Sequence, residues 1–413
     1  MKIQYRLTII VSAIVITAIA ALSMVLLSRA TTMQLDEARQ SQDRLAAEQT
    51  RNIQIQYEGY FRIIHTLAGI MADFDDLEPG MQRSRFEPML ESTLRSNEHV
   101  VGIFVVFKSN TIDPGMDAHF IDQSGNTATG QWASWYTRRT GVIEHLVYEN
   151  VPEIMASIAA NIRTATIDEP QPLTVMGTST HLLKITVPVI HRQTNEIVGR
   201  IGINVDTKYI QPLVTAILNN NAEIDAISIY SANTTIIASP NVEQVGLPLK
   251  EGQKALYGTF ADQAHDAVVQ AKSFRFTGYS RILDETLAII LYPFSIGDTG
   301  VYWALMLGTN RDMILSDIRA MTIFAVSIAL GVLLISMILV YAAAQTISKP
   351  IIKVALTLKD ISGDEGDLTR VVEISSKDEI GDLARYFNAT LEKIRDLVMV
   401  IKEQSACLFT IGS

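Results

Sequence analysis

"KITVPVIHRQTNEIVGRIGINVD", residues 184–206, is the stretch that decides the fold of this chain. It belongs to two β-rich runs, 181–190 and 196–206, which flank the polar pentapeptide "HRQTN". Runs rich in β-branched residues and bounded by turn residues are typical of strands, and a short polar connection between two of them is typical of a hairpin. The stretch therefore predicts an antiparallel β-hairpin.

More β-rich runs lie on both sides of this hairpin, and helical sequence at 209–218 separates an earlier set from a later one. An order of strands, one helix and more strands predicts an α+β fold of two antiparallel modules joined by a short helix. The further runs are 100–108 before the hairpin and 226–239, 267–276, 286–294 and 303–309 after it.

Residues 30–72 precede these modules and predict one long helix, because apolar residues recur there mostly at alternating steps of four and three. The apolar face could pair with a second copy of the chain, or pack on a sheet of the same chain, and the two roles are compatible. The face consists of Leu45, Ile53, Tyr57, Tyr60, Ile64, Leu67 and Met71.

Two runs without any charged residue, Leu7–Leu27 and Ala320–Ala344, are long enough to cross a membrane as helices. The first run is longer than the apolar part of a signal peptide and lacks a small-residue cleavage site, which favours an uncleaved anchor. Lys2 and Arg6 before the first run, with the lysines after the second, place both termini in the cytoplasm by the positive-inside rule. The segment between the runs is then extracytoplasmic, although Arg29, Arg311 and Arg319 weaken the contrast.

The formal charge of -10 resides in the outer segment, since the charges of residues 1–28 and 345–413 cancel. This argues against nucleic acid or anionic lipid as its ligand. Cys407 is the single cysteine, so the outer segment has no disulfide. The seven histidines show neither HxH nor HExxH spacing, which predicts structural histidines and no metal site or cofactor.

The hairpin stretch resembles the central hairpin of double Cache sensor domains. "TATIDEPQPLTVMG" (164–177) resembles their "EP" loop, with Glu169 and Pro170 in place, and "ISIYSANTTIIASPNVEQVGLPL" (227–249) is similar to the start of the membrane-proximal module. The resemblance covers residues 30–315. It implies a two-module sensor between two transmembrane helices, with a small-molecule pocket in the distal module formed mainly by residues 100–206.

The residues of that pocket are harder to name, because the amino-acid-binding motif of the family is essentially absent. "ASWY" (133–136) has Ala133 where the motif has arginine, and the hairpin has Asn204 where the family has aspartate. Asp206 is the nearest acid and either contacts a ligand or caps the following helix. Trp135 and Tyr136 either wall the pocket or support a loop, while a carboxylate ligand would be held by Lys184 or Arg138. The ligand-binding candidates are Phe104, Trp135, Tyr136, Arg138, Lys184, Asn204 and Asp206.

"GDEGDLTRVVEISSKDEIGDLARYFN" (363–388) lies between two segments with heptad-like apolar spacing, and Pro350 is expected in the first turn of the first helix. The proline, "GDL" at 366–368, and "DEIG" at 378–381 with "FN" at 387–388 strongly resemble a HAMP domain, a parallel four-helix coiled coil in a homodimer. A juxtamembrane coiled coil without a signalling role is the plainer alternative. The resemblance implies signal-relay roles for Pro350, Gly366, Leu368, Ile374, Asp378 and Glu379.

"IRDLVMVIKEQSACLFTIGS" (394–413) resembles the start of the cytoplasmic hairpin of methyl-accepting chemotaxis proteins. The resemblance implies a transmembrane chemoreceptor, not an enzyme, that controls a chemotaxis histidine kinase with its coupling protein through a signalling domain missing from this sequence. A sensor histidine kinase is the alternative. The expected parts are a cytoplasmic N-terminus (1–6), a transmembrane helix (7–28), the sensor (29–318, with long helix 30–72, distal module 73–212 and proximal module 213–315), a second transmembrane helix (319–344), HAMP (345–402) and the start of a signalling helix (403–413).

Overall fold

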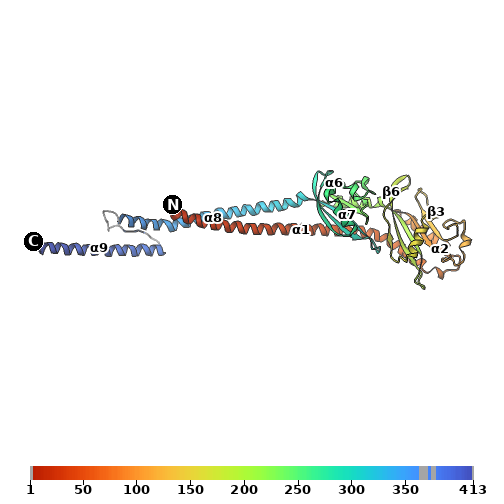
Figure 1. Ribbon diagram of the computed structural model, residues 1–413, viewed down its shortest axis with the longest axis horizontal. Helices are drawn as coiled ribbons and strands as arrows, with labels where there is room; N and C mark the ends of the chain where they lie inside the picture. Colours follow the sequence, from red (N-terminus) through yellow and green to blue (C-terminus); the bar gives the residue numbers. More distant parts are fainter. Residues whose placement is uncertain (1–2, 362–370, 374–377, 412–413) are drawn as a thin grey trace. The chain divides into compact units, whose positions relative to one another are not determined.

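The computed structural model describes residues 3–361, 371–373 and 378–411 (Figure 1). The chain divides into two compact units, one of residues 35–316 and one that joins residues 1–34 to residues 317–413. The predicted relay residues Gly366, Leu368 and Ile374 lie outside the described residues.

Among the described residues, two helices are long and apolar enough to cross a membrane, α1 (Ile3–Met71) and α8 (Arg311–Ile361). Their uncharged stretches expose aliphatic side chains such as Ile10, Leu26 and Leu339. Exposed aliphatic residues over such a length suit the hydrocarbon interior of a bilayer. In the sequence, the two apolar stretches bracket residues 35–316.

The expectation that Pro350 lies in the first turn of a helix is wrong, because α8 runs from Arg311 to Ile361 and contains the proline. No glycine-rich break separates the apolar run from the segment that follows it, so the helix continues. A proline inside a helix lacks the N–H that would bond the carbonyl four residues earlier, here that of Thr346, and its ring crowds that carbonyl. The next helix, α9 (Glu379–Ile411), begins at Glu379.

The C-terminal part of α1 packs on the two β-sheet modules along the predicted apolar face. Ile53, Ile64 and Met71 are fully buried, and the Tyr57 ring meets the Trp303 ring edge-on at 5.1 Å. Gln42 Nε2 donates to the Ala288 carbonyl at 2.9 Å, which fixes the helix against the proximal sheet. The face therefore packs on a sheet of its own chain, and pairing with a second copy stays a prediction.

The distal module is a seven-stranded antiparallel sheet with the order β3-β2-β1-β7-β6-β4, in which β5 also pairs with β6. Because side chains alternate along a strand, Ile103 and Val105 face α1 and α2, while Phe104 and Val106 face α3. The elements are η1 (Phe74–Asp76), α2 (Gln82–Ser96), β1 (Val100–Phe107), η2 (Asp117–Phe120), β2 (Ala133–Thr137), β3 (Glu144–Val147), α3 (Val151–Ala159), β4 (Thr166–Ile167), β5 (Gln171–Val175), β6 (Thr178–Ile190) and β7 (Ile197–Asp206).

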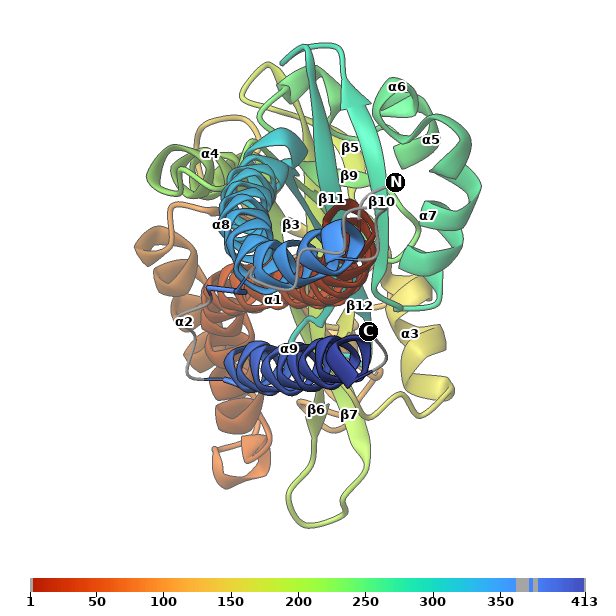
Figure 2. The same ribbon diagram turned by 90° about the vertical axis from the view of Figure 1, so that its left-hand side faces the viewer.

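The predicted hairpin is present as β6 and β7, and Figure 2 shows its turn projecting at the edge of the sensor. Its register pairs Lys184 with Asn204 and Leu182 with Asp206. β7 also pairs with β1, so the hairpin forms the centre of the sheet. Residues 184–206 thus organise the distal module.

The proximal module is a five-stranded antiparallel sheet with the order β10-β11-β12-β8-β9, reached through η3 (Thr207–Ile210) and α4 (Gln211–Asn220). The strand predicted at 267–276 is wrong for residues 267–273. Residues 267–269 are the end of a helix, and β10 begins only at Phe274. The remaining elements are β8 (Ala226–Tyr230), β9 (Ile236–Ala238), η4 (Val242–Gln244), α5 (Leu249–Gly252), α6 (Lys254–Tyr257), η5 (Gly258–Phe260), α7 (Ala261–Val269), β10 (Phe274–Ser280), β11 (Glu285–Ser295) and β12 (Tyr302–Asn310).

Candidate functional site

A cavity of about 170 Å³ lies in the distal module, over the face of the sheet formed by β1, β2, β6 and β7. The segment between β3 and α3 and the strand β5 complete its walls. At about 30 Å³ per water molecule, it holds a small organic molecule rather than a large one. Its lining residues are Val101, Gly102, Trp135, Thr137, Arg139, Tyr148, Glu149, Asn150, Asp168, Gln171, Pro172, Leu173, Leu182, Lys184 and Asn204.

Trp135 supplies a buried hydrogen-bond donor to this cavity. Its side chain is only 5% exposed, and its indole N–H has no hydrogen-bond partner among the described residues. Gly102 makes room for the ring, because a Cβ at that position would lie 2.7 Å from Trp135 Nε1. A buried donor without an acceptor costs about 1–3 kcal/mol. An acceptor on a ligand would remove that cost.

Lys184 contributes a positive charge that carboxylates already surround. Its ammonium lies 2.6 Å from Asp168 Oδ2 and 2.5 Å from Glu153 Oε1. Burial is the largest single influence and acts to lower the pKa of Lys184, but the hydrogen bonds to Asp168 and Glu153 together outweigh it, so the pKa is raised. Lys184 is therefore charged at neutral pH and already has partners.

The second cation of the cavity is also paired. Arg139 Nη1 lies 3.3 Å from Glu149 Oε1, and its guanidinium carbon lies 5.4 Å from the centre of the Trp135 ring. The two cations at the site are thus met by three carboxylates, those of Glu149, Glu153 and Asp168. The excess of negative charge favours a cationic or zwitterionic ligand over an anionic one.

Tyr148 forms an aromatic wall of the cavity and packs on Phe104, which lies behind it. Its ring stacks on the Phe104 ring with centroids 3.8 Å apart. Phe104 in turn lies directly over Gly202, where a Cβ would come within 2.4 Å of Phe104 Cζ and 2.8 Å of the Ile185 carbonyl oxygen. The wall therefore depends on a glycine in the central strand.

Gly202→Ala should destabilise the chain by about 1–3 kcal/mol, because the added methyl group meets a backbone carbonyl that cannot move freely. Thermal unfolding of the full chain in phospholipid nanodiscs measures the effect. Gly59→Ala is the matched control, since a Cβ at that helical position would meet nothing within 4 Å. Equal unfolding temperatures for the two variants would contradict this account of the wall.

The structure brings together three of the sequence-predicted ligand residues, Trp135, Lys184 and Asn204, at this cavity. Phe104 lies behind it. Tyr136 points to the opposite face of the sheet, where its ring stacks on His145 at 4.2 Å, as expected for a neighbour of Trp135 along a strand. These placements leave the residues' roles in binding as proposals.

Arg138 and Asp206 do not line this cavity. The Arg138 guanidinium donates to the Leu94 carbonyl near the end of α2. Asp206 caps η3, since its Oδ1 accepts from the Lys208 backbone N–H at 2.9 Å, and it lines a different cavity. Of the two roles left open for Asp206, the cap is therefore present.

Sequence reasoning missed Tyr148, Asp168 and Arg139 as lining residues, and Glu153 beside them. All four lie in connecting segments or in a short helix, where no periodic pattern marks a side chain as facing a cavity. The signal for Asp168 was available, because it directly precedes the recognised Glu169–Pro170 pair.

The predicted relay residues that the structure describes lie around the start of α9 and in α8. Asp378 Oδ1 accepts from the backbone N–H groups of Ile380 and Gly381, each at 3.1 Å, so it caps α9. Glu379 is the first residue of that helix. Val372 packs with Val354 of α8 and Ala384 of α9.

Comparison with known proteins identifies a HAMP domain at residues 342–396. The chain is 22% identical over 341 residues to the methyl-accepting chemotaxis protein TlpQ of Pseudomonas aeruginosa, which covers 76% of this chain and 46% of that protein. It is 36% identical over 124 residues to the methyl-accepting chemotaxis protein McpC of Bacillus subtilis, which covers 30% of this chain and 18% of that protein. The match thus spans less than half the length of these relatives.

Among solved structures, the sensor is similar to the extracellular domain of the putative histidine kinase mmHK1S-Z3. The match has a TM-score of 0.54 and 16% identity, and covers 68% of this chain and 97% of that one. At this identity the likeness concerns the fold alone. It confirms the predicted α+β sensor fold, and the HAMP match and sequence relatives confirm the resemblance to methyl-accepting chemotaxis proteins with a HAMP domain.

Proposed function

We propose that this chain is the sensing and relay part of a transmembrane chemoreceptor of the methyl-accepting chemotaxis type. Its sequence relatives, its HAMP domain and the two apolar helices on either side of the sensor support the proposal. The relatives are receptors rather than enzymes, which fits a chain that carries a signal. The sensor histidine kinase alternative is not favoured, because the kinase-derived neighbours share only the fold.

The topology and partners follow from the same proposal. The distribution of Lys and Arg around the apolar helices supports cytoplasmic termini and an extracytoplasmic sensor. The HAMP domain supports a homodimer, since each chain supplies two of the helices that such a coiled coil needs. A chemotaxis histidine kinase and its coupling protein would receive the signal from a signalling domain linked to α9.

The distal cavity is the proposed sensing site, and the Trp135 indole N–H, which has no hydrogen-bond partner in the described part of the chain, is the observation that carries this assignment. A ligand with a hydrogen-bond acceptor would satisfy the indole, and an ammonium group would complement the surplus of carboxylates around Lys184 and Arg139. The proposed ligand is a small organic ammonium compound that also carries an acceptor oxygen. An anionic ligand is less suited, because both cations already have carboxylate partners.

Ethanolamine should raise the unfolding temperature of the full chain in nanodiscs, whereas ethylene glycol and glycolate, its neutral and anionic counterparts, should not. A ligand that binds only the folded state adds about 2.7 kcal/mol of apparent stability at a hundredfold excess over Kd. Asp168→Asn should weaken ethanolamine at least tenfold, since a hydrogen bond to a charged group contributes about 1.5–3 kcal/mol.

Asp262→Asn is the control for this substitution, because Asp262 is 86% exposed and lies in the proximal module. Stabilisation by glycolate alone would replace the proposed ammonium ligand with a carboxylate held by Lys184. Equal ethanolamine affinity in the Asp168 variant and the parent chain would remove the distal cavity as the site.

A further inference from the structure

A second cavity, of about 340 Å³, lies where the two modules of the sensor meet. The turn between β5 and β6 and the end of β7 with η3 form its distal walls, and the loop around η4 forms its proximal wall. It shares no lining residue with the first cavity. Its lining residues are Val175, Thr178, Ser179, Thr180, His181, Asp206, Thr207, Lys208, Gln211, Val242 and Val245.

Asp206 is the acidic residue of this lining, and one oxygen of its carboxylate accepts no hydrogen bond from the described residues. The residue is fully buried, and its Oδ1 accepts hydrogen bonds from the Thr180 hydroxyl and the Lys208 N–H. Oδ2 accepts no hydrogen bond from any described residue. The Lys208 ammonium lies 3.2 Å from Oδ2, but without hydrogen-bond geometry. A buried carboxylate oxygen in this state favours a better-placed cationic donor.

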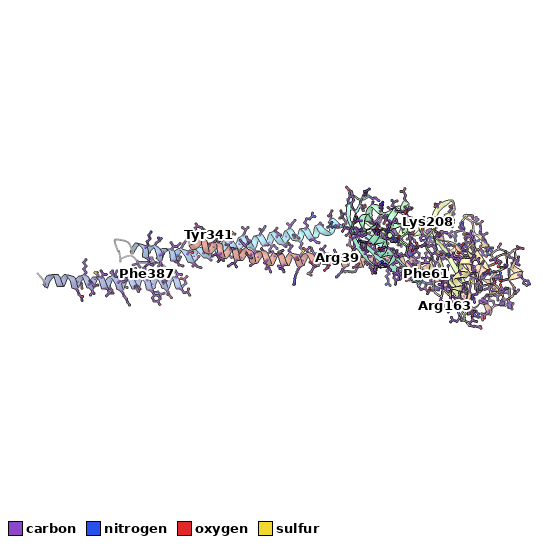
Figure 3. The ribbon with its side chains drawn as sticks, in the orientation of Figure 1. Arg39, Phe61, Arg163, Lys208, Tyr341 and Phe387 are labelled. Carbon is purple, nitrogen blue, oxygen red and sulfur yellow. The ribbon has the colours of Figure 1, made fainter. Side chains whose placement is uncertain are left out.

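Lys208 is a weak competitor for that position. Its side chain is 47% exposed, so the ammonium can return to water when another cation replaces it (Lys208 is labelled in Figure 3). Its nitrogen also lies 5.1 Å from the centre of the Tyr209 ring, which offers the displaced side chain an alternative contact. Displacement would leave the cap intact, because the cap uses the Lys208 backbone.

The remaining walls suit an uncharged body attached to the cation. Val175, Val242 and Val245 supply apolar surface. His181 adds an imidazole ring that is packed so closely on Gly246 that a Cβ there would lie 2.1 Å from its Nε2. Burial lowers the pKa of His181, against the opposing influence of Asp206, so the ring brings no second positive charge at neutral pH.

We propose that this inter-module cavity is a second binding site, for a small organic ammonium with a compact apolar body. The ammonium replaces that of Lys208 at Asp206 Oδ2, and the body packs between the valines and the His181 ring. Because the walls come from both modules, such a ligand would bridge them. The Leu182–Asp206 pair lies two residues along each strand from the Lys184–Asn204 pair at the first cavity, so the same strands reach both sites.

The test uses the full chain in phospholipid nanodiscs and isothermal titration calorimetry with cyclohexylammonium, with cyclohexanol as the neutral match. Saturable binding of cyclohexylammonium is expected, with cyclohexanol at least tenfold weaker. Asp206→Asn should weaken cyclohexylammonium at least tenfold while keeping the fold, because asparagine is also a good N-cap. Lys208→Met should tighten it severalfold, since the competing cation is gone.

Asp262→Asn is the matched control and should leave cyclohexylammonium binding unchanged, because Asp262 is 86% exposed and lines neither cavity. A purely structural Asp206–Lys208 pair would make both variants of that pair neutral or weaker, so tighter binding by Lys208→Met distinguishes a site from a stabilising contact. The proposal is overturned by the absence of saturable binding, by parental affinity in Asp206→Asn, or by loss of binding in Asp262→Asn.

Discussion

Arg83→Met should destabilise the sensor by about 3–5 kcal/mol, because it leaves two buried carboxylates without their cation. The Arg83 side chain is 3% exposed, and its guanidinium lies 2.7 Å from Asp113 Oδ2 and 2.6 Å from Asp117 Oδ1. It also donates to the Gly130 carbonyl at 2.7 Å and to Asn126 Oδ1. The Arg83 side chain of α2 thus fixes the long connection between β1 and β2, which leads to Trp135.

The measurement is denaturant unfolding of the chain in nanodiscs, followed by tryptophan fluorescence. Trp132 lies at the end of this connection, is fully buried, and its ring stacks on the Phe86 ring. Its fluorescence therefore reports on the folding of the connection. Arg95→Met is the matched control on the same helix. Arg95 is 64% exposed and pairs with Glu91, four residues earlier on the same helix, and exposed pairs of this kind contribute about 0.2–1 kcal/mol.

A triple variant separates the loss of charge from the loss of packing. Asp113→Asn and Asp117→Asn in the Arg83→Met background remove the unpaired charges and should restore part of the lost stability. An Arg83→Met variant as stable as Arg95→Met would contradict the view that buried ion pairs fix the connection between β1 and β2.

The hairpin and the ion pairs of Arg83 illustrate which parts of this structure can be predicted from the sequence and which cannot. The hairpin at 184–206 was predictable because strand period and turn chemistry are local properties. Trp135, Lys184 and Asn204 were reachable as well, since the central strands of the sheet line the cavity. The ion pairs of Arg83 join residues 30 and 34 positions apart, and no local pattern announces them.

Two predictions were wrong because the wider context prevailed over a local preference. The run at 267–276 contains β-formers, yet Ala264, Ala267 and Val268 face the core from one side of α7, so helical packing prevailed over strand propensity. Pro350 was read as a helix start from its residue type, while the continuous apolar helix before it decided the outcome. In both cases the wider context prevailed over the preference of a single residue.

Glu379→Ala should remove ligand control of kinase activity while leaving ligand affinity unchanged. Glu379 begins α9 beside the cap formed by Asp378, and an acidic residue in a first turn contributes about 0.3–1 kcal/mol through the helix dipole. A ligand shifts two states only by its differential affinity for them, so a relay that responds must hold them close in energy. A small loss at this helix start is therefore large against that balance.

The contacts between α8, α9 and the segment that joins them, here called the connector, indicate where two alternative packings of these helices would differ. Asn388 of α9 accepts from the Val372 N–H at 2.8 Å and donates to its carbonyl at 3.1 Å, while Lys353 of α8 donates to the Glu373 carbonyl at 2.9 Å. The described part of the connector is thus hydrogen-bonded to both helices.

Pro350→Ala should also make the kinase output independent of ligand. Pro350 lies one turn before Val354, and the substitution restores a backbone N–H in α8, which favours one helix packing over the other.

The experiment joins this chain through α9 to the signalling domain of the Bacillus subtilis relative McpC and measures kinase activity in membranes with and without ethanolamine. Glu392→Ala is the matched control, because Glu392 lies in the middle of α9 and has an exposed partner, Arg395, at 3.8 Å. Ligand-dependent kinase activity is expected in the parent hybrid and in the control, and a constant activity in Glu379→Ala and Pro350→Ala. Normal regulation in both variants would mean that the start of α9 and the proline of α8 play no part in the relay. Constant activity with weakened ethanolamine binding would move the defect from the relay to the sensor, so affinity is measured on the same membranes.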